Sequence, residues 1–303
     1  MPYLSELKNL CEKLGCGFLT EEPLSMHTTF RVGGCCRVLI YINSIENLVK
    51  LLLFIKTNNI KYFVLGKGSN VIASDDGFDG VVLVFGSDFS SIKFEGKNEL
   101  VCSAGISLKD LCLFALEREL TGLEFAYGIP GTAGGALFMN AGAYGGEMSD
   151  VVVSAEYIDE DLNLCRIEKA DMKLSYRHSI FSENRNYIIT SICLKLEQGS
   201  GEEIRVHMDE LLHRRKDKQP LNYPSAGSTF KRPEGSYASL LIDQCGLKGM
   251  NVGGAEVSCK HSGFIINKGN ATCSDILKLS EKVIEIVKSK TGYVLELEPE
   301  ILK

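Results

Sequence analysis

Residues 128–147 read GIPGTAGGALFMNAGAYGGE, a segment in which seven residues are glycine, four are alanine and only Glu147 is charged. A flexible linker is normally rich in serine as well as glycine and stays solvated. Five apolar side chains favour burial instead: Ile129, Leu137, Phe138, Met139 and Tyr144. Glycine in a buried segment supplies either a positive φ or a close approach of the backbone to a neighbour. The segment therefore predicts a loop whose backbone lies directly against another group.

The composition is that of an ordinary globular protein with two or three domains. The 303 residues are 45% hydrophobic and 24% charged, with a net charge of −6 that disfavours sequence-independent binding of nucleic acid. The apolar run at 47–56, NLVKLLLFIK, is too short and too charged to span a bilayer. The N-terminus lacks the pattern of a secretory signal. We therefore expect a cytoplasmic protein without nucleic-acid or membrane partners.

Eleven cysteines raise the alternatives of disulfides, a metal site or free thiols. Their number is odd, they form no C-x-x-C pair, and several lie in apolar runs such as LVCSAG and SICLKL. Cysteine in such runs behaves as a small hydrophobic residue. We expect reduced structural thiols and no metal site.

Hydrophobic periodicity predicts an α+β chain with a boundary near residue 200. Strands are expected over 61–66, 80–85, 151–159, 162–169, 186–197 and 293–303, with a hairpin around Gly96. Helices are expected over 4–14, 45–58, 108–120, 201–218, 236–244 and 274–290, the last capped by Ser274.

A second glycine loop, GKGSN at 66–70, follows the first of these buried strands. Successive backbone N–H groups in a tight turn form an anion-binding nest, and Ser69 and Asn70 add side-chain donors. The motif lacks the third glycine of a Rossmann fingerprint and the ending of a Walker loop. Taken alone, it indicates an ordinary tight turn as much as a phosphate site.

Eight motifs follow one another along the chain: HTTFRVGG (27–34), VLGKGSNVIASD (64–75), GIPGTAGGALFMNAGAYG (128–145), SYRHSIF (175–181), KQP (218–220), GSTFKRP (227–233), GGAEVSCKHSGFIIN (253–267) and LEPEI (297–301). Together and in this order, they resemble the UDP-N-acetylenolpyruvoylglucosamine reductase (MurB) family. The resemblance runs from about residue 20 to the C-terminus.

This resemblance implies an α+β fold with an FAD-binding part of the vanillyl-alcohol oxidase type. The implied domains are an FAD-binding subdomain at 1–85, a second FAD-binding subdomain at 86–200, and a substrate-binding domain at 201–303 whose last strand returns to the active site. Six residues between Phe181 and the next strand resemble the short class of the family, which lacks a tyrosine-bearing loop.

The implied activity is the reduction of UDP-N-acetylglucosamine enolpyruvate to UDP-N-acetylmuramate with NADPH and noncovalent FAD. This reaction supplies peptidoglycan precursors, and so affects cell wall, cell shape and division. Both glycine loops of the family approach the FAD pyrophosphate, which offers a reason for the segment at 128–147. The implied cofactor-binding residues are Gly66, Lys67, Gly68, Ser69, Asn70, Gly128, Ile129, Pro130, Gly131, Thr132, Gly134, Gly135, Asn140, Ala141 and Gly142.

Three residues match the family's catalytic positions. Arg177 can grip the substrate carboxylate with its planar fork, although a surface salt bridge explains an isolated arginine equally well. Ser228 matches the proton donor, where a serine after glycine is otherwise a turn residue. Glu300 matches the residue that helps to stabilise the enol-type intermediate. Glu298 shares its strand face, so spacing alone does not separate the two glutamates.

Substrate contacts are implied for Tyr176, Lys218 and Arg232. Lys218 lies in the basic run HRRKDKQP (213–220), where a cation at a helix end is an alternative explanation. Many family members have asparagine in place of Arg232, so a substrate contact differs there. His178, beside Arg177, is interpreted as structural, and Asn267 and His261 approach the site by analogy only.

Two alternatives remain from the residues themselves. A related FAD oxidase would use oxygen, and such enzymes often tether the flavin through histidine or cysteine in the first glycine loop, where this chain has neither. A non-catalytic nucleotide-binding protein could share the scaffold, because fold does not determine function. The partners expected are small molecules, and a monomer is favoured.

Overall fold

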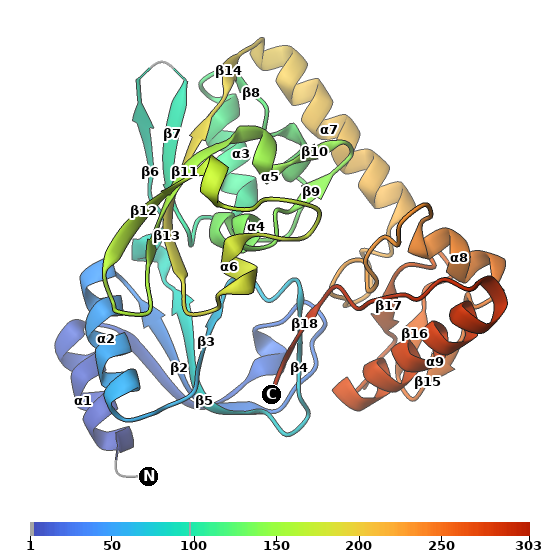
Figure 1. Ribbon diagram of the computed structural model, residues 1–303, viewed down its shortest axis with the longest axis horizontal. Coiled ribbons are helices and arrows are strands. Elements are labelled where there is room, and N and C mark those ends of the chain that lie inside the picture. The colour runs from blue at the N-terminus through green and yellow to red at the C-terminus, as the bar shows by residue number, and fades with distance from the viewer. Residues whose placement is uncertain (1–2, 97) are drawn as a thin grey trace. The chain divides into compact units, whose positions relative to one another are not determined.

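A computed structural model describes residues 3–96 and 98–303 (Figure 1). The chain forms two compact units, each built from three stretches of sequence. The first comprises the chain up to Leu19 with Val38–Gly66 and Gly80–Arg214. The second comprises Thr20–Arg37, Lys67–Asp79 and Arg215–Lys303. Helices and strands are mixed in both, which confirms the α+β fold class.

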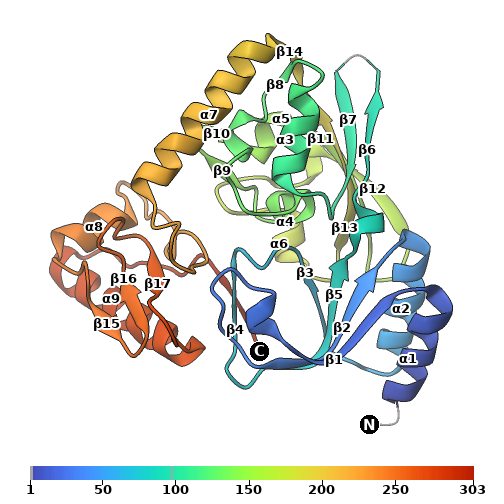
Figure 2. The same cartoon turned by 180° about the vertical axis from the view of Figure 1, so that it is seen from behind.

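Two helices cover a four-stranded sheet that belongs mostly to the first unit (Figures 1 and 2). The elements are α1 (Tyr3–Leu14), β1 (Gly17–Pro23), β2 (Cys35–Ile42), α2 (Ile45–Thr57), β3 (Tyr62–Leu65) and β5 (Phe78–Phe85). The sheet order is β1-β2-β5-β3, with β3 parallel to β5. Leu7, Ile40 and Leu52 share its core. Ser44 begins α2 because its hydroxyl accepts a hydrogen bond from the N–H of Asn47 at 3.2 Å.

An antiparallel sheet of five strands, in the order β12-β11-β13-β7-β6, organises the rest of the first unit. Its strands are β6 (Ile92–Glu95), β7 (Glu99–Ser103), β11 (Val152–Ile158), β12 (Leu164–Glu168) and β13 (Ile188–Lys195). The short helices α3 (Leu108–Leu116) and α4 (Ala133–Phe138) lie beside it (Figure 2) and share its core, which contains Leu111, Leu137 and Ile192. Smaller elements are β8 (Leu120–Thr121), β9 (Gly142–Ala143), β10 (Gly146–Glu147), α5 (Met148–Val151), α6 (Ile180–Glu183) and β14 (Glu197–Gln198).

The second unit has its own core, which includes Ile242, Ile265 and Leu279. Its elements are β4 (Val71–Ala73), α8 (Ala238–Gln244), β15 (Asn251–Val252), β16 (Ala255–Val257), β17 (Ile265–Asn267), α9 (Cys273–Thr291) and β18 (Glu300–Leu302). Strands β15, β16 and β17 form a small antiparallel sheet, and β18 pairs in parallel with β4. Helix α7 (Gly201–Lys218) has the bounds that the sequence predicts.

Three predicted elements differ from the structure at their ends. Helix α3 stops at Leu116 rather than residue 120, because Glu119 has a φ of 55° and Leu120 pairs with Gln198 in a short strand. Helix α9 is capped by Thr272, whose hydroxyl accepts from the N–H of Asp275, and not by Ser274. The strand expected over 293–303 is limited to β18, which pairs with β4, because Leu297 makes no more than an isolated bridge to Phe230.

All eleven cysteines are free thiols, and seven of them are buried. Burial raises the pKa of the Cys11 thiol to about 12 and that of Cys36 to about 11. Within residues 3–96 and 98–303, no helix is long and apolar enough to cross a bilayer.

Candidate active site

The predicted site residues fall into two groups, one in each unit. The first unit contains the loop at 128–142 and the turn that bears Tyr176 and Arg177. The second contains Lys67–Asn70, Lys218, Ser228, Arg232 and Glu300. Each group is built from segments that are distant in sequence, so main-chain hydrogen bonds rather than sequence neighbours position the side chains.

The loop at 128–142 is anchored around Thr132. Its hydroxyl accepts a hydrogen bond from the N–H of Gly135 at 3.2 Å and so caps α4. The N–H of Leu108 donates to Gly131 O at 3.0 Å, which ties the loop to the start of α3. The N–H groups of Gly131 and Thr132 have no acceptor among the described residues. This edge of the loop therefore offers free donors to a ligand.

Several glycines are required by packing within the protein. A Cβ on Gly134 would lie 2.7 Å from the Cβ of Ala104, and one on Gly142 would lie 2.6 Å from Gly146 O. A Cβ on Gly66 would lie 2.8 Å from Oγ1 of Thr132, so the first glycine loop begins against the second. The expected close approach of backbone is therefore present, with protein as the neighbour at these positions.

Arg177 lies at the tip of a tight turn. Ser175 and His178 close the turn with two main-chain hydrogen bonds of 3.2 and 3.1 Å. Arg177 follows Tyr176 with a φ of 54°, the left-handed conformation found at the third position of a type II turn. Its Nη2 donates to Gly142 O at 3.2 Å, and its guanidinium lies 5.1 Å from the centre of the Tyr176 ring. The half-buried cation is thus held against the loop at 128–142.

The first glycine loop is tied to the strand that carries Glu300. The N–H of Glu300 donates to Asn70 O at 2.9 Å, and Nδ2 of Asn70 donates to Glu298 O at 3.3 Å. Within the described part of the chain, the N–H groups of residues 67–70 have no acceptor. Gly68 has a φ of 59°, which turns successive N–H groups toward one side, as in an anion-binding nest.

Ser228 lies beside the same C-terminal segment. The N–H of Glu298 donates to Thr229 O at 3.0 Å, and Phe230 bridges Leu297 in antiparallel register. The Thr229 N–H donates to Gly263 O at 2.8 Å, which fixes the other side of the Ser228 segment. The Ser228 hydroxyl is half-buried and has no hydrogen-bond partner among the residues described. It is therefore free to donate a proton to a bound molecule.

The segment of residues 296–302 joins separate parts of the predicted site. It carries Glu300, and it contacts the Ser228 segment on one side and the first glycine loop with β4 on the other. Glu298 and Glu300 are both half-buried and both make interactions, so exposure does not separate the two glutamates.

The predicted substrate-binding side chains are open to solvent. Lys218 ends α7 and is exposed, and the nearby Lys216 O accepts a hydrogen bond from Nζ of Lys260 at 2.6 Å. Arg232 is exposed, with its guanidinium 4.9 Å from the Tyr237 ring. Lys216, Lys218 and Lys260 therefore place three cationic side chains on adjacent segments at the end of α7.

Two histidines near these segments have structural contacts. His178 closes the Arg177 turn, and its Nδ1 lies 2.9 Å from Lys173 O. His261 accepts a hydrogen bond from the N–H of Gly263 at 3.2 Å, and burial lowers the pKa of its ring. His261 therefore supports the residue that holds Thr229.

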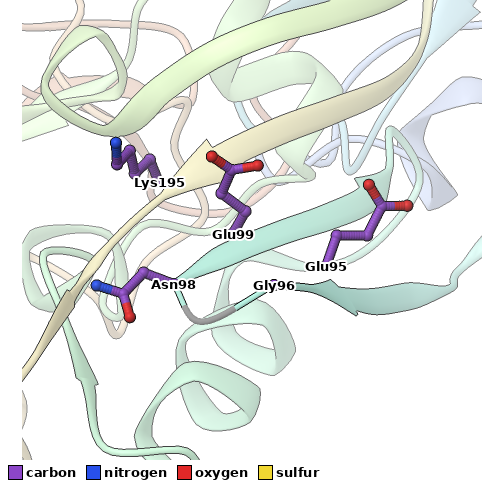
Figure 3. Close-up of a pocket in the computed structure, with 5 residues that line it drawn as sticks. All are labelled: Glu95, Gly96, Asn98, Glu99 and Lys195. Carbon is purple, nitrogen blue, oxygen red and sulfur yellow. The ribbon is translucent and has the colours of Figure 1, made fainter.

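Each glycine loop by itself fits an anion such as a pyrophosphate group, because each presents main-chain N–H groups without acceptors in the described chain. A pocket beside the β6–β7 hairpin has a different lining, of Glu95, Gly96, Asn98, Glu99 and Lys195 (Figure 3). None of these belongs to the predicted site. Among residues 3–96 and 98–303, no group of three or more His, Cys, Asp or Glu side chains could hold a metal ion.

Sequence reasoning missed how the loop at 128–142 holds the turn that bears Arg177. Gly142 O accepts from Arg177, and the Asn140 side chain reaches Ser175 O at 3.0 Å, across 35 residues of sequence. No local pattern signals these contacts. The one available signal is an asparagine directly after a short helix, the place where glycine usually ends a helix.

Comparison with known proteins identifies two domains. Residues 219–302 match the family model of the UDP-N-acetylenolpyruvoylglucosamine reductase C-terminal domain. Residues 36–167 match an FAD binding domain.

Similar proteins cover nearly the whole chain. A UDP-N-acetylenolpyruvoylglucosamine reductase from Caldanaerobacter subterraneus subsp. tengcongensis is 49% identical over 93% of this chain and 91% of its own length. The reductase of Clostridium novyi is 48% identical over 91% of this chain and 89% of its own length. A crystal structure of the Thermus caldophilus enzyme has a TM-score of 0.80 and 33% identity, and the match covers 95% of this chain and 99% of that one.

Proposed function

The chain belongs to the UDP-N-acetylenolpyruvoylglucosamine reductase family and is an oxidoreductase with an FAD-binding domain, and we propose that it reduces the enolpyruvyl ether of UDP-N-acetylglucosamine with NADPH as hydride donor. The product, UDP-N-acetylmuramate, is a precursor of peptidoglycan. Bound FAD would supply the hydride-transfer chemistry between the nicotinamide and the CH₂ carbon of the enolpyruvyl group.

One geometric observation carries the proposal. The segment of residues 296–302 contacts Thr229, next to Ser228, through Glu298, and it contacts Asn70 of the first glycine loop through the N–H of Glu300. Ser228, Glu300 and main-chain N–H groups without acceptors therefore belong to segments that one set of hydrogen bonds holds together. This combination suits a reaction in which a carbon atom must be protonated beside a nucleotide cofactor.

Each residue has a separate task in this proposal. Arg177 binds the substrate carboxylate, which takes up negative charge as hydride arrives at the neighbouring double bond. Ser228 gives its proton to the carbon next to that carboxylate. Glu300 helps to stabilise the enol-type intermediate. Lys218 and Arg232 bind the UDP-sugar, and Tyr176, which is 43% exposed, packs against the substrate.

We propose that FAD is bound noncovalently by the two glycine loops. The free N–H groups of 67–70 and of Gly131 and Thr132 would hold its pyrophosphate, since such donors favour anions. The remaining residues of this proposed set lie on the same two loops: Gly66, Gly128, Ile129, Pro130, Gly134, Gly135, Asn140, Ala141 and Gly142.

An anaerobic stopped-flow experiment tests the function. NADPH should bleach the visible flavin absorbance of the holoenzyme, and UDP-N-acetylglucosamine enolpyruvate should then restore it without oxygen. Recovery of the absorbance only with oxygen would indicate an oxidase, and no response to NADPH would indicate a nucleotide-binding protein. Release of flavin by acid precipitation checks that the cofactor is noncovalent.

Replacement of Ser228 tests the proton donor. Ser228→Ala should leave reduction by NADPH unchanged and slow reoxidation by the sugar nucleotide by roughly 10²-fold or more, the usual effect of losing a positioned acid. Ser228→Cys should restore part of the rate, because a thiol also donates. Ser236→Ala, at another half-buried serine of the second unit, is the matched control. Slower reduction by NADPH in Ser228→Ala would assign Ser228 to cofactor binding instead.

We further propose a monomer that acts in the cytoplasm on the UDP-sugar and NADPH. The division into domains 1–85, 86–200 and 201–303 also stays a prediction. Light scattering of the holoenzyme measures the mass, and limited proteolysis locates exposed boundaries.

A further inference from the structure

Asn140 ends helix α4 in a conformation that does not require a side chain. Its φ is 45°, its N–H donates to Leu137 O, and the next N–H, of Ala141, donates to Ala136 O. These two bonds form the Schellman motif that ends many helices, and the position of Asn140 in it is most often glycine. Asn140 is nevertheless completely buried, so its side chain is placed among neighbours that need it.

Both ends of the Asn140 amide are used. Its Nδ2 donates to Ser175 O at 3.0 Å, and its Oδ1 accepts from the N–H of Ser149 at 2.8 Å. A carbonyl faces one end and an N–H faces the other, so only one orientation of the amide satisfies both. Losing either bond would leave a polar group of the buried amide unpaired, which is unfavourable.

The carbonyl that Asn140 holds belongs to the first residue of the Arg177 turn. Ser175 O accepts from the N–H of His178 at 3.1 Å and uses its second lone pair for Asn140. Two further contacts join the same loop to the same turn. The Ser179 hydroxyl donates to Phe138 O at 2.5 Å, and Nη2 of Arg177 donates to Gly142 O at 3.2 Å.

These contacts alternate along the loop at residues 138, 140 and 142. In the middle contact, the loop contributes the side chain of Asn140. The contacts on either side use main-chain oxygens, which any residue would supply. The residue type at position 140 therefore determines whether the base of the turn is held.

We propose that Asn140 is a positioning residue for Arg177, and that its amide fixes the turn from which the guanidinium reaches the substrate carboxylate. This inference rests on the proposed function for the role of Arg177. Asn140 also connects the loop proposed to bind FAD, to which its backbone belongs, with the turn that carries Arg177. Displacement of a substrate-orienting group by about 1 Å lowers rates by about 10²-fold.

Two substitutions separate the two ends of the amide. Asn140→Gly keeps the left-handed backbone and removes both hydrogen bonds. Asn140→Asp keeps the acceptor for Ser149 but places a carboxylate oxygen against Ser175 O. With FAD saturating, both variants should be reoxidised by UDP-N-acetylglucosamine enolpyruvate about 10- to 100-fold more slowly than the wild type, a larger loss than in their reduction by NADPH. Wild-type reoxidation by Asn140→Asp would mean that the contact with Ser149 is the one that matters, and would overturn the proposal.

A double-mutant comparison tests the route through Arg177. In the Arg177→Lys background, Asn140→Gly should change reoxidation by less than about twofold, because the group that it positions is already impaired. A full additional loss would show that Asn140 acts elsewhere. Thr190→Val is the control, since it removes another buried hydrogen bond of the first unit, from Thr190 to Glu156 O at 3.1 Å. It should leave both half-reactions unchanged.

Hydrogen exchange gives a readout that does not depend on turnover. In the holoenzyme, Asn140→Gly and Asn140→Asp should both speed amide exchange in a peptide covering residues 173–181, whereas Thr190→Val should not. Unchanged exchange in that peptide would overturn the positioning role. If the wild-type holoenzyme failed to reduce the sugar nucleotide, the proposed function would fall, and the exchange comparison would still decide whether Asn140 holds the turn.

Discussion

Replacing Gly68 with alanine should destabilise the protein whether or not flavin is bound. The backbone of Gly68 has a φ of 59°, a conformation that L-residues other than glycine rarely adopt. A Cβ at this position would overlap His27 O and lie 2.8 Å from the Cα of Thr28. Both obstacles are main-chain atoms, which cannot rotate away as a side chain can. The conflict therefore lies within the protein rather than with a ligand.

The expected loss follows from two contributions. An L-residue in the left-handed region costs about 1–2 kcal/mol, and forcing a methyl group into a packed site costs roughly 1–3 kcal/mol. The free energy of unfolding should fall by about 2–5 kcal/mol, which corresponds to a decrease in Tm of roughly 5–20 °C for a cooperative unit of this size. This is a large part of the stability of an ordinary domain.

Gly135→Ala is the matched control. Gly135 lies in helix α4, and a Cβ there would contact only Oγ1 of Thr132, at 3.3 Å. Alanine favours a helix over glycine by about 1 kcal/mol. Gly135→Ala should therefore change the stability of the flavin-free protein much less than Gly68→Ala does, because its one close neighbour is a side-chain atom.

Urea unfolding followed by circular dichroism, with the flavin removed and with saturating FAD, measures both variants. Gly68→Ala should lower the midpoint in both conditions, since FAD adds the same kind of linkage stabilisation to any protein that binds it. An unchanged midpoint for flavin-free Gly68→Ala, with a deficit only when FAD is present, would refute the packing argument and leave cofactor contact as the reason for glycine.

Three further predictions address the site and the thiols. Arg177→Lys keeps the charge but loses the fork, so reoxidation by substrate should slow while NADPH still reduces the flavin; wild-type single-turnover rates would make Arg177 a surface residue. Gly131→Val should purify with little flavin, measured as the ratio of visible to ultraviolet absorbance, and full occupancy would contradict the loop assignment. At about pH 8, a thiol reagent should label exposed Cys35 and Cys259 first, because burial raises the pKa of Cys36 to about 11 and leaves little thiolate. Early labelling of Cys36, located by mass spectrometry, would argue against a closed core.

The features that sequence predicts well are local. Helix α7 begins and ends where its composition changes, and Ser44 caps α2 through a contact three residues away. Ser107 caps α3 in the same way. Errors arise where a distant partner decides the outcome. Leu120 joins a strand because it pairs with Gln198. The C-terminal strand is short because its ladder of main-chain hydrogen bonds extends only along β4.

The site divides along the same line. The sequence and the family resemblance predict which residue types form the site, such as an arginine for a carboxylate and a serine for a proton. They do not predict the hydrogen bonds that hold these residues in place, because Asn140 meets Ser175 and Asn70 meets Glu298 only after folding. The residue-by-residue assignments stay predictions until the variants above are measured.

The pairing of β4 with β18 has a consequence for the order of events during protein synthesis. Ala73 pairs with Leu302, about 230 residues later. At a ribosomal rate of about 5–20 residues per second, roughly 10 to 50 s separate the appearance of the two strands. During this interval β4 carries an unpaired edge, of the kind that invites association with other chains. Chaperones that bind nascent chains would therefore matter most for this enzyme between the synthesis of β4 and that of β18.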